Sequence, residues 1–261
     1  MIERDPWLAF ARHTPARIAL GRTGASLPTQ EVLRFALAHA QARDAVHTPF
    51  DATEVATQVR ALGFETVQIA SAAPARDVYL RRPDLGRRLA EASRATLETS
   101  AHGPVDLALV VADGLSSAAV HAQAVPFLAA LKPWIEKEKW RVSPVCIAAQ
   151  ARVALGDEVG AALKARAVLV MIGERPGLSS PDSLGLYLTF APRPGRTDAE
   201  RNCISNVRAE GLSHNAAAFK LAWLLKEALR REITGVDLKD ESDARLDGVQ
   251  PPSALPGAGE A

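Results

Sequence analysis

The chain of 261 residues is poor in cysteine, in aromatic residues and in net charge, and each shortage excludes a class of protein. Two cysteines, Cys146 and Cys203, cannot build a disulfide framework or a four-ligand zinc site, so we expect a reducing, cytoplasmic compartment. An aromatic content of 5% argues against a base-stacking surface, and a net charge of +1 leaves no electrostatic footprint for nucleic acid or an anionic membrane. We therefore expect neither nucleic acid nor a membrane as a partner.

Long apolar runs and phosphate-binding glycine loops are missing as well. No apolar run approaches the length that crosses a bilayer, and the segment 1–7 carries acidic residues where a secretory signal has an apolar stretch. Neither a Gly-x-Gly-x-x-Gly nor a Walker-type glycine loop occurs, so a nucleotide would lack its usual phosphate cradle. The serine nucleophile elbow of many hydrolases does not occur either.

What the chain does have is an alternation of strand and helix patterns. Apolar, β-branched runs predict strands at 66–70, 105–111, 145–149, 167–172 and 186–190. Apolar residues at helical spacing, with capping residues, predict helices at 26–46, 52–62, 83–98, 116–131, 156–164 and 215–233. Pro126 should kink or split the helix that holds it. The alternation predicts βαβ units and an α/β fold, with a Rossmann-like, mostly parallel sheet flanked by helices.

Three regions are expected along the chain. Residues 1–65 form a smaller helical N-terminal region, whose first 25 residues are irregular and too short to bury themselves, so they should pack on another domain or chain. Residues 66–238 form the Rossmann-like domain. Residues 239–261 are charged and then rich in Pro, Gly and Ala, with too little apolar surface to offset their ordering entropy, so we expect a disordered tail.

The most informative segment is 168–183, where an apolar run ends abruptly at Gly173 and is followed by Glu174 and Arg175. In open α/β sheets, ligands bind at the carboxyl ends of such strands. A carboxylate and a guanidinium there cost desolvation energy unless something pairs with them. We therefore take both as candidate site residues, with a surface ion pair as the alternative.

Two other loops follow predicted strands. Asp113 and Ser116 stand at a strand-to-helix turn, where helix capping is the simpler interpretation and a ligand contact the alternative. Arg152 and Val153 follow the strand that holds Cys146, and from the residues alone they are a surface arginine and a core valine. Asp157 is most simply a residue at the start of the next helix.

The polar segment 196–206 lies between the last predicted strand and the last helix, and it contains Cys203. A free cysteine is usually a small buried apolar residue, so by itself it indicates no ligand. The six histidines are scattered without metal spacing, and we expect no metal ligand in this chain.

Taken together, six segments of the chain resemble the small-subunit family of ethanolamine ammonia-lyase. They occur in the family's order and cover most of the folded part. The segments are Thr14–Arg22, Leu80–Leu89, Ala112–Ser116, Arg152–Asp157, Gly173–Leu178 and Asn202–Asn206.

The resemblance implies an enzyme that uses adenosylcobalamin to convert ethanolamine to acetaldehyde and ammonia. It implies that a large TIM-barrel subunit holds the substrate, and that this chain clamps the cobalamin at the interface between the two subunits. The cobalamin contacts it implies in this chain are Val153, Glu174 and Cys203, with no catalytic residue. No Asp-x-His-x-x-Gly motif occurs, which agrees with a base-on cofactor that keeps its own dimethylbenzimidazole on cobalt.

The resemblance also implies a hetero-oligomer, a trimer of paired heterodimers, located in the cytoplasm or within a bacterial microcompartment. We expect the isolated chain to have no lyase activity. Two other classes stay open from the residues alone: a stand-alone nucleotide-binding enzyme, which a nucleotide titration would detect, and an interaction protein that docks through its N-terminal region. A corrinoid spectrum in a complex with the large subunit would distinguish the cofactor-clamping subunit from both.

Overall fold

The computed structural model describes residues 5–14, 16–100 and 103–243, and a six-stranded sheet forms its centre. The strands are β1 (Thr66–Ala70), β2 (Val105–Ala112), β3 (Val142–Ala149), β4 (Ala165–Gly173), β5 (Leu184–Phe190) and β6 (Asn202–Val207). They lie in the order β1-β3-β2-β4-β5-β6. The first four strands of this order are parallel, and β5 and β6 each run antiparallel to the preceding neighbour. The predicted α/β fold with a mostly parallel sheet is confirmed.

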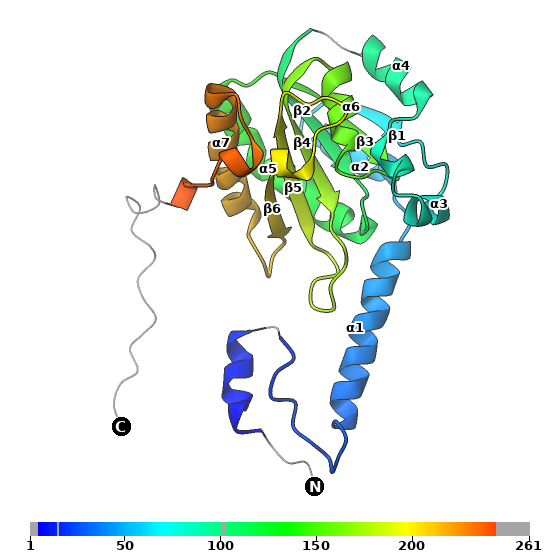
Figure 1. Ribbon diagram of the computed structural model, residues 1–261, viewed down its shortest axis with the longest axis vertical. Helices are drawn as coiled ribbons and strands as arrows, with labels where there is room; N and C mark the ends of the chain where they lie inside the picture. Colours follow the sequence, from blue (N-terminus) through cyan, green and yellow to red (C-terminus); the bar gives the residue numbers. More distant parts are fainter. Residues whose placement is uncertain (1–4, 15, 101–102, 244–261) are drawn as a thin grey trace.

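Helices cover both faces of the sheet (Figure 1). The α-helices are α1 (Thr29–His47), α2 (Ala52–Ala61), α3 (Arg76–Arg81), α4 (Glu91–Thr99), α5 (Ser117–Glu138), α6 (Leu155–Ala162) and α7 (His214–Arg231). Short 3-10 helices are η1 (Pro6–His13), η2 (Leu85–Arg87), η3 (Asp198–Glu200) and η4 (Gly235–Asp237). One apolar cluster joins the sheet to α2, α5 and α7, and a second joins it to α4 and α6. Since both faces are buried, β2 and β4 are almost continuous apolar runs.

The single helix predicted over 83–98 is wrong, because the chain forms the short η2 and then α4 there, with an extended stretch between them. Pro83 lacks an amide hydrogen and restricts the residue before it, and α3 ends before it at Arg81. Beyond it the backbone turns to the sheet: the Ala72 amide donates to Arg88 O at 2.8 Å, and the Ala90 amide to Ala70 O at 3.0 Å. These bonds hold the chain extended where the sequence pattern predicts a helix.

Of the two effects expected at Pro126, the split does not occur, and the kink stays a prediction. Helix α5 runs for 22 residues with Pro126 and Pro133 inside it, well past the predicted end at 131. Leu128, Leu131 and Ile135 are buried on its inner face, so packing against the sheet continues through both prolines.

Strand β6 was not predicted, because the segment 196–206 is polar. The strand lies at the edge of the sheet, with Ile204 and Val207 buried and Cys203 exposed. Its polar face masks the apolar alternation that usually predicts a strand. Cys203 therefore lies within a strand, and not on a loop beside one.

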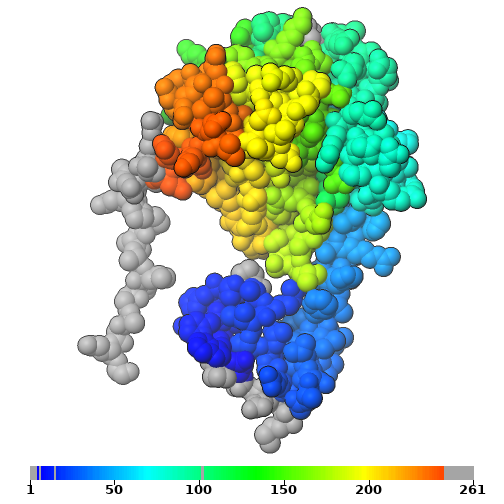
Figure 2. Space-filling view, in the orientation of Figure 1, coloured from blue at the N-terminus to red at the C-terminus, as the bar shows by residue number. Residues whose placement is uncertain are grey.

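The N-terminal region forms an arm outside the sheet domain. Figure 1 shows α1 running away from the sheet with η1 beside its far part, and in Figure 2 these residues make a separate lobe. The lobe meets the loop after β4, where Arg17 Nη2 donates to Leu178 O at 3.2 Å. Within the first 25 residues, expected to be irregular, 6–13 form η1. Large apolar side chains on the arm stay exposed: Trp7, Leu8, Phe10, Ile18, Leu27, Val32, Leu33, Phe35 and Leu37.

None of the helices described between residues 5 and 243 is long and apolar enough to cross a bilayer. Of the predicted disordered tail, residues 244–261 lie outside the described residues, and the disorder stays a prediction. The division at residues 65 and 238 likewise stays a prediction.

Candidate functional site

A cavity of about 400 Å³ opens at the edge of the sheet where the parallel strands end. This is the edge at which open α/β sheets bind their ligands. Val153 and Glu174, which lie 21 positions apart in the sequence, both line it. The full lining is Tyr79, Gly114, Leu115, Arg152, Val153, Ile172, Gly173, Glu174, Arg175 and Tyr187.

Cys203 lies beside this cavity, one strand further along the sheet. Its register partner on β5 is Tyr187, which lines the cavity and is in turn paired with Val170 on β4. Burial raises the pKa of the Cys203 thiol, although a hydrogen bond with the Tyr187 hydroxyl opposes that change. Val153 and Glu174 thus line one cavity, and Cys203 lies outside that lining on the neighbouring strand, opposite Tyr187.

The surface beside the cavity is a shelf on β5 and β6, formed by Gly185, Tyr187 and Cys203. Helix α6 packs on β2 and β4 and leaves Cys203 exposed. Gly185 leaves room for the side chains of Glu174 and Tyr187, because a Cβ atom there would lie 2.9 Å from Glu174 Oε1 and 3.1 Å from the Tyr187 ring. We call these residues the β5–β6 shelf.

Glu174 is held by one of its two carboxylate oxygens. Oε2 accepts one hydrogen bond from the Ser183 hydroxyl and a second from the backbone N–H of Asn206 at 3.3 Å. The Glu174 amide also donates to Ser183 O at 3.0 Å, which fixes the backbone. No described residue donates a hydrogen bond to Oε1, the oxygen over Gly185. Glu174 is thus a fixed acceptor with one oxygen available to a ligand.

Arg152 and Arg175 supply positive charge to the same cavity. The guanidinium of Arg152 lies 4.4 Å from the centre of the Tyr79 ring, and its buried Nε has no hydrogen-bond partner among the described residues. Arg175 is exposed and, like Glu174, makes no ion pair within the described part of the chain. Among the described residues, the alternative of a surface ion pair at 174–175 is therefore not seen, and both arginines line the cavity.

The turn after β2 combines capping with a buried carboxylate. Ser116 caps α5 as predicted, accepting a hydrogen bond from the Ala119 amide at 3.1 Å. Asp113 caps nothing: it is fully buried and accepts from the Ala151 amide at 2.9 Å and from Arg76 Nη1 at 3.3 Å. Burial raises the pKa of Asp113, against the opposing effect of those donors.

The turns after β2 and β4 are in tight contact, which fixes the floor of the cavity. The Leu115 amide donates to Gly173 O at 2.9 Å, and a Cβ atom on Gly173 would lie 2.0 Å from Ser116 O. Gly114 has φ +59°, and a Cβ there would lie 2.2 Å from Gly173 O. Only glycine fits at either position.

Sequence reasoning missed several residues around the site. Arg76 and Tyr79 belong to no motif, and only their contacts with Asp113 and Arg152 in the folded chain identify them. Asp157 does stand in the first turn of α6 as predicted, but it is also the buried partner of Arg201.

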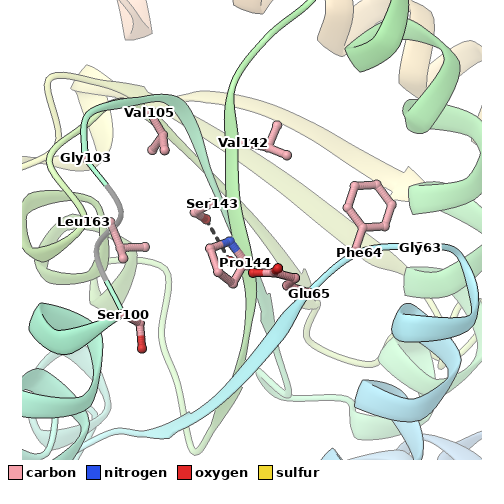
Figure 3. Close-up of a pocket in the computed structure, with 10 residues that line it drawn as sticks. All are labelled: Gly63, Phe64, Glu65, Ser100, Gly103, Val105, Val142, Ser143, Pro144 and Leu163. Carbon is pink, nitrogen blue, oxygen red and sulfur yellow. Dashed lines mark hydrogen bonds between the residues drawn. The ribbon is translucent and has the colours of Figure 1, made fainter.

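Two other cavities are weaker candidates. One of about 270 Å³ lies at the amino ends of the strands and is mainly apolar; its Ser143 hydroxyl already donates to Pro144 O at 2.7 Å (Figure 3). A charged groove of about 540 Å³ includes Asp157 and Arg196, which are already paired with Arg201 and Glu200. Among the residues that the structure describes, no group of His, Cys, Asp and Glu side chains is placed to hold a metal ion.

Comparison with known proteins gives a consistent result. The profile of the family described as ethanolamine ammonia-lyase light chain (EutC) matches residues 4–239. The chain is similar to the protein named ethanolamine ammonia-lyase small subunit from Pseudomonas syringae pv. tomato, with 58% identity over 91% of this chain and 84% of that protein. Small subunits of the same name from Xanthomonas campestris pv. campestris and Pseudomonas aeruginosa PAO1 are 57% and 56% identical, over 94% and 95% of this chain and 92% of each relative.

Proposed function

Because the chain belongs to the ethanolamine ammonia-lyase light-chain family, we propose that it closes over adenosylcobalamin and clamps the cofactor against the large subunit of that lyase. The family assignment confirms the resemblance seen in the sequence. One observation carries the cofactor proposal: Val153 and Glu174 share one cavity, and Cys203 lies on the shelf beside it. Relatives named as small subunits support a large-subunit partner.

The donor set of the site suits a corrinoid, a flat ring system with amide side chains at its rim. Among the described residues, Oε1 of Glu174 has no donor and is open to an amide N–H, and the buried Nε of Arg152 has no acceptor. An unpaired buried donor costs free energy unless a ligand satisfies it. Val153 offers apolar contact, and the β5–β6 shelf offers Tyr187 and the Cys203 thiol as a flat flank.

The division of labour in such an enzyme follows from the cofactor. When bound, adenosylcobalamin supplies radical chemistry, and protein supplies position and seclusion from water. In this chain Glu174 orients the ring rim, Val153 and the β5–β6 shelf exclude water, and no residue is assigned to proton transfer. The conversion of ethanolamine to acetaldehyde and ammonia belongs to the large subunit, so the isolated chain has no lyase activity.

The N-terminal arm is the part of the chain that docks on the large subunit. Helix α1 buries only Ala38 and Ala45, while Leu33, Phe35 and Leu37 stay exposed. A helix that exposes apolar side chains over so much of its surface needs a partner to cover them. The hetero-oligomer of paired heterodimers and the microcompartment location implied by the resemblance stay predictions.

Co-expression with the large subunit, followed by titration with adenosylcobalamin, tests the proposal. The complex should show the visible corrinoid spectrum, and Glu174→Ala should weaken binding about 10- to 100-fold, as expected for loss of a hydrogen bond to a charged group. Glu98→Ala is the matched control, because Glu98 is exposed on α4 away from the cavity.

Two outcomes would contradict the proposal. One is a complex in which Glu174→Ala binds the cofactor as tightly as the unmodified protein. The other, which concerns the division of labour, is deamination of ethanolamine by the purified chain alone.

A further inference from the structure

One arginine joins the N-terminal arm to the edge of the sheet that carries the site. Arg76, at the start of α3, donates from Nε and Nη2 to Val46 O at 3.0 and 2.8 Å. Val46 is the penultimate residue of α1, so this carbonyl has no partner within the helix. From Nη1, Arg76 donates to Gly114 O at 2.8 Å and to Asp113 Oδ2 at 3.3 Å. All three guanidinium nitrogens thus bridge α1 and the turn after β2.

The groups that Arg76 contacts hold the loop after β3 in turn. Asp113 Oδ1 accepts from the Ala151 amide at 2.9 Å, and the Tyr79 hydroxyl donates to Ala151 O at 3.1 Å. The guanidinium of Arg76 lies 4.9 Å from the centre of the Tyr79 ring, and that of Arg152 lies 4.4 Å from it. Both backbone groups of Ala151 are therefore fixed by residues that touch Arg76.

The loop at 150–153 needs external contacts to keep its conformation, because its backbone is strained. Gln150 has φ +55°, in the left-handed region that favours glycine, and its buried Oε1 has no hydrogen-bond partner among the described residues. Such a conformation persists only when its surroundings determine it. The next residues, Arg152 and Val153, line the cavity.

We propose that Arg76 is a positioning residue, which fixes the position of the N-terminal arm relative to the loop at 150–153. Docking of the partner and binding of the cofactor then depend on each other. The inference rests on the proposed function, since it assigns the arm to the large subunit and the loop to adenosylcobalamin. It identifies Arg76, Tyr79 and Asp113 as determinants of cofactor affinity although only Tyr79 lines the cavity. A continuous chain of contacts carries the coupling, from Val46 through Arg76 to Ala151.

The test uses the complex of both subunits, with adenosylcobalamin titrated by visible absorption. Arg76→Gln should raise the cofactor Kd about tenfold, the lower end of what is lost when a residue that orients ligand-binding groups is removed. The amount of cofactor bound per complex at saturation should stay unchanged. A merely structural defect would lower the amount of cofactor bound at saturation and leave the Kd unchanged, because the fraction that still folds binds normally.

Three further measurements complete the design. Arg76→Lys keeps the charge beside Asp113 but offers a single nitrogen, so its Kd should lie between those of the unmodified complex and Arg76→Gln. Arg81→Gln is the control on the same helix, because Arg81 is exposed and its only hydrogen-bond partner among the described residues is Asp77; the Kd of this variant should be unchanged. Affinity for the large subunit without cofactor should fall in Arg76→Gln, since the arm loses its anchor.

An unchanged Kd and an unchanged large-subunit affinity in Arg76→Gln would overturn the inference. If that variant does not assemble, Tyr79→Phe deletes only the hydroxyl that holds Ala151, and it should raise the Kd about threefold, in line with one neutral hydrogen bond; an unchanged Kd there overturns the inference equally. An unmodified complex that binds no adenosylcobalamin would instead reject the proposed function, so the two failures are distinguishable.

Discussion

Arg201 and Asp157 form a buried ion pair with two parallel hydrogen bonds, which ties the edge strand β6 to helix α6. Nη1 lies 2.6 Å from Oδ1 and Nη2 lies 2.7 Å from Oδ2, and each side chain is only 2% exposed. Nη1 also donates to Thr189 Oγ1 at 3.0 Å. Because Cys203 follows Arg201 by two residues, the pair fixes the strand that carries the outer part of the β5–β6 shelf.

Breaking this pair should destabilise the protein strongly. Asp157→Ala leaves the Arg201 guanidinium buried without its partner, and we expect a loss of about 3–5 kcal/mol in the free energy of unfolding. Urea unfolding measures this. Asp198→Ala is the matched control, because Asp198 contacts the same arginine at 3.4 Å but is 95% exposed, and we expect a loss of at most about 1 kcal/mol. Equal losses in the two variants would contradict the assigned importance of the buried pair.

Two glycines of one segment should respond very differently to alanine. Gly173→Ala places a Cβ atom 2.0 Å from Ser116 O, so we expect a loss of stability of about 1–3 kcal/mol from overpacking. Gly177→Ala meets nothing closer than 3.9 Å and should be tolerated. Thermal unfolding of both variants checks this, and a tolerated Gly173→Ala would show that the turns after β2 and β4 can separate.

The two cysteines should differ in labelling by a thiol reagent. In the isolated chain Cys203 is exposed, whereas Cys146 is fully buried and its pKa is raised to about 12 by that burial. We expect Cys203 alone to be alkylated, faster as the pH rises, because its own pKa is above the ordinary value. Mass spectrometry gives the extent. In the complex with adenosylcobalamin Cys203 should be protected, and equal labelling of free and complexed chains would argue against its place in the cofactor site.

Acid should weaken the protein partly through Glu200. The Thr197 amide donates to its carboxylate at 2.7 Å, Arg196 pairs with it, and its pKa falls from 4.5 to about 2. A carboxyl whose pKa is lowered on folding stabilises the folded state above the unfolded pKa, and that contribution disappears as the pH falls. The stability deficit of Glu200→Gln relative to the unmodified chain should therefore be constant above about pH 5 and vanish towards pH 2. Urea unfolding from pH 2 to 7 measures it, with Glu98→Gln as the control; a deficit independent of pH would contradict the prediction.

Polar substitutions on α1 should separate folding from assembly. Leu33 and Leu37 are 64% and 60% exposed, so replacing both with Ser should change the stability of the isolated chain by less than about 1 kcal/mol. Affinity for the large subunit should fall about tenfold or more, since buried apolar anchors dominate an interface. Gln41→Ser, an exposed polar position on the same helix, is the control. Unchanged affinity in the leucine variant would contradict the proposal that the arm forms the interface with the large subunit.

Local pattern predicted the elements well where its signals agreed. The strand at 66–70 and the end of α2 before Gly63 agree with the structure, because apolar periodicity and a glycine terminator point the same way there. The region around Pro83 was mispredicted, since backbone bonds to residues 70 and 72 outweigh helical spacing. Strand β6 was missed because only one of its faces packs on the core.

The site was predictable only in part. Glu174 and Arg175 stand out in the sequence as charges at a strand end, but the contacts proposed for Val153 and Cys203 are implied only by the resemblance. Their convergence depends on β5 and β6 reversing direction beside β4, which no local pattern specifies. Arg76 could not be identified from the sequence either, because the partners it holds lie 30 to 38 positions away in the chain.

The exposed apolar arm bears on how the protein is made. A newly synthesised copy exposes these apolar side chains before it assembles with a partner, and two such copies can associate through them. If the large subunit covers this surface as proposed, we expect simultaneous production of both polypeptides to raise the yield of assembled enzyme.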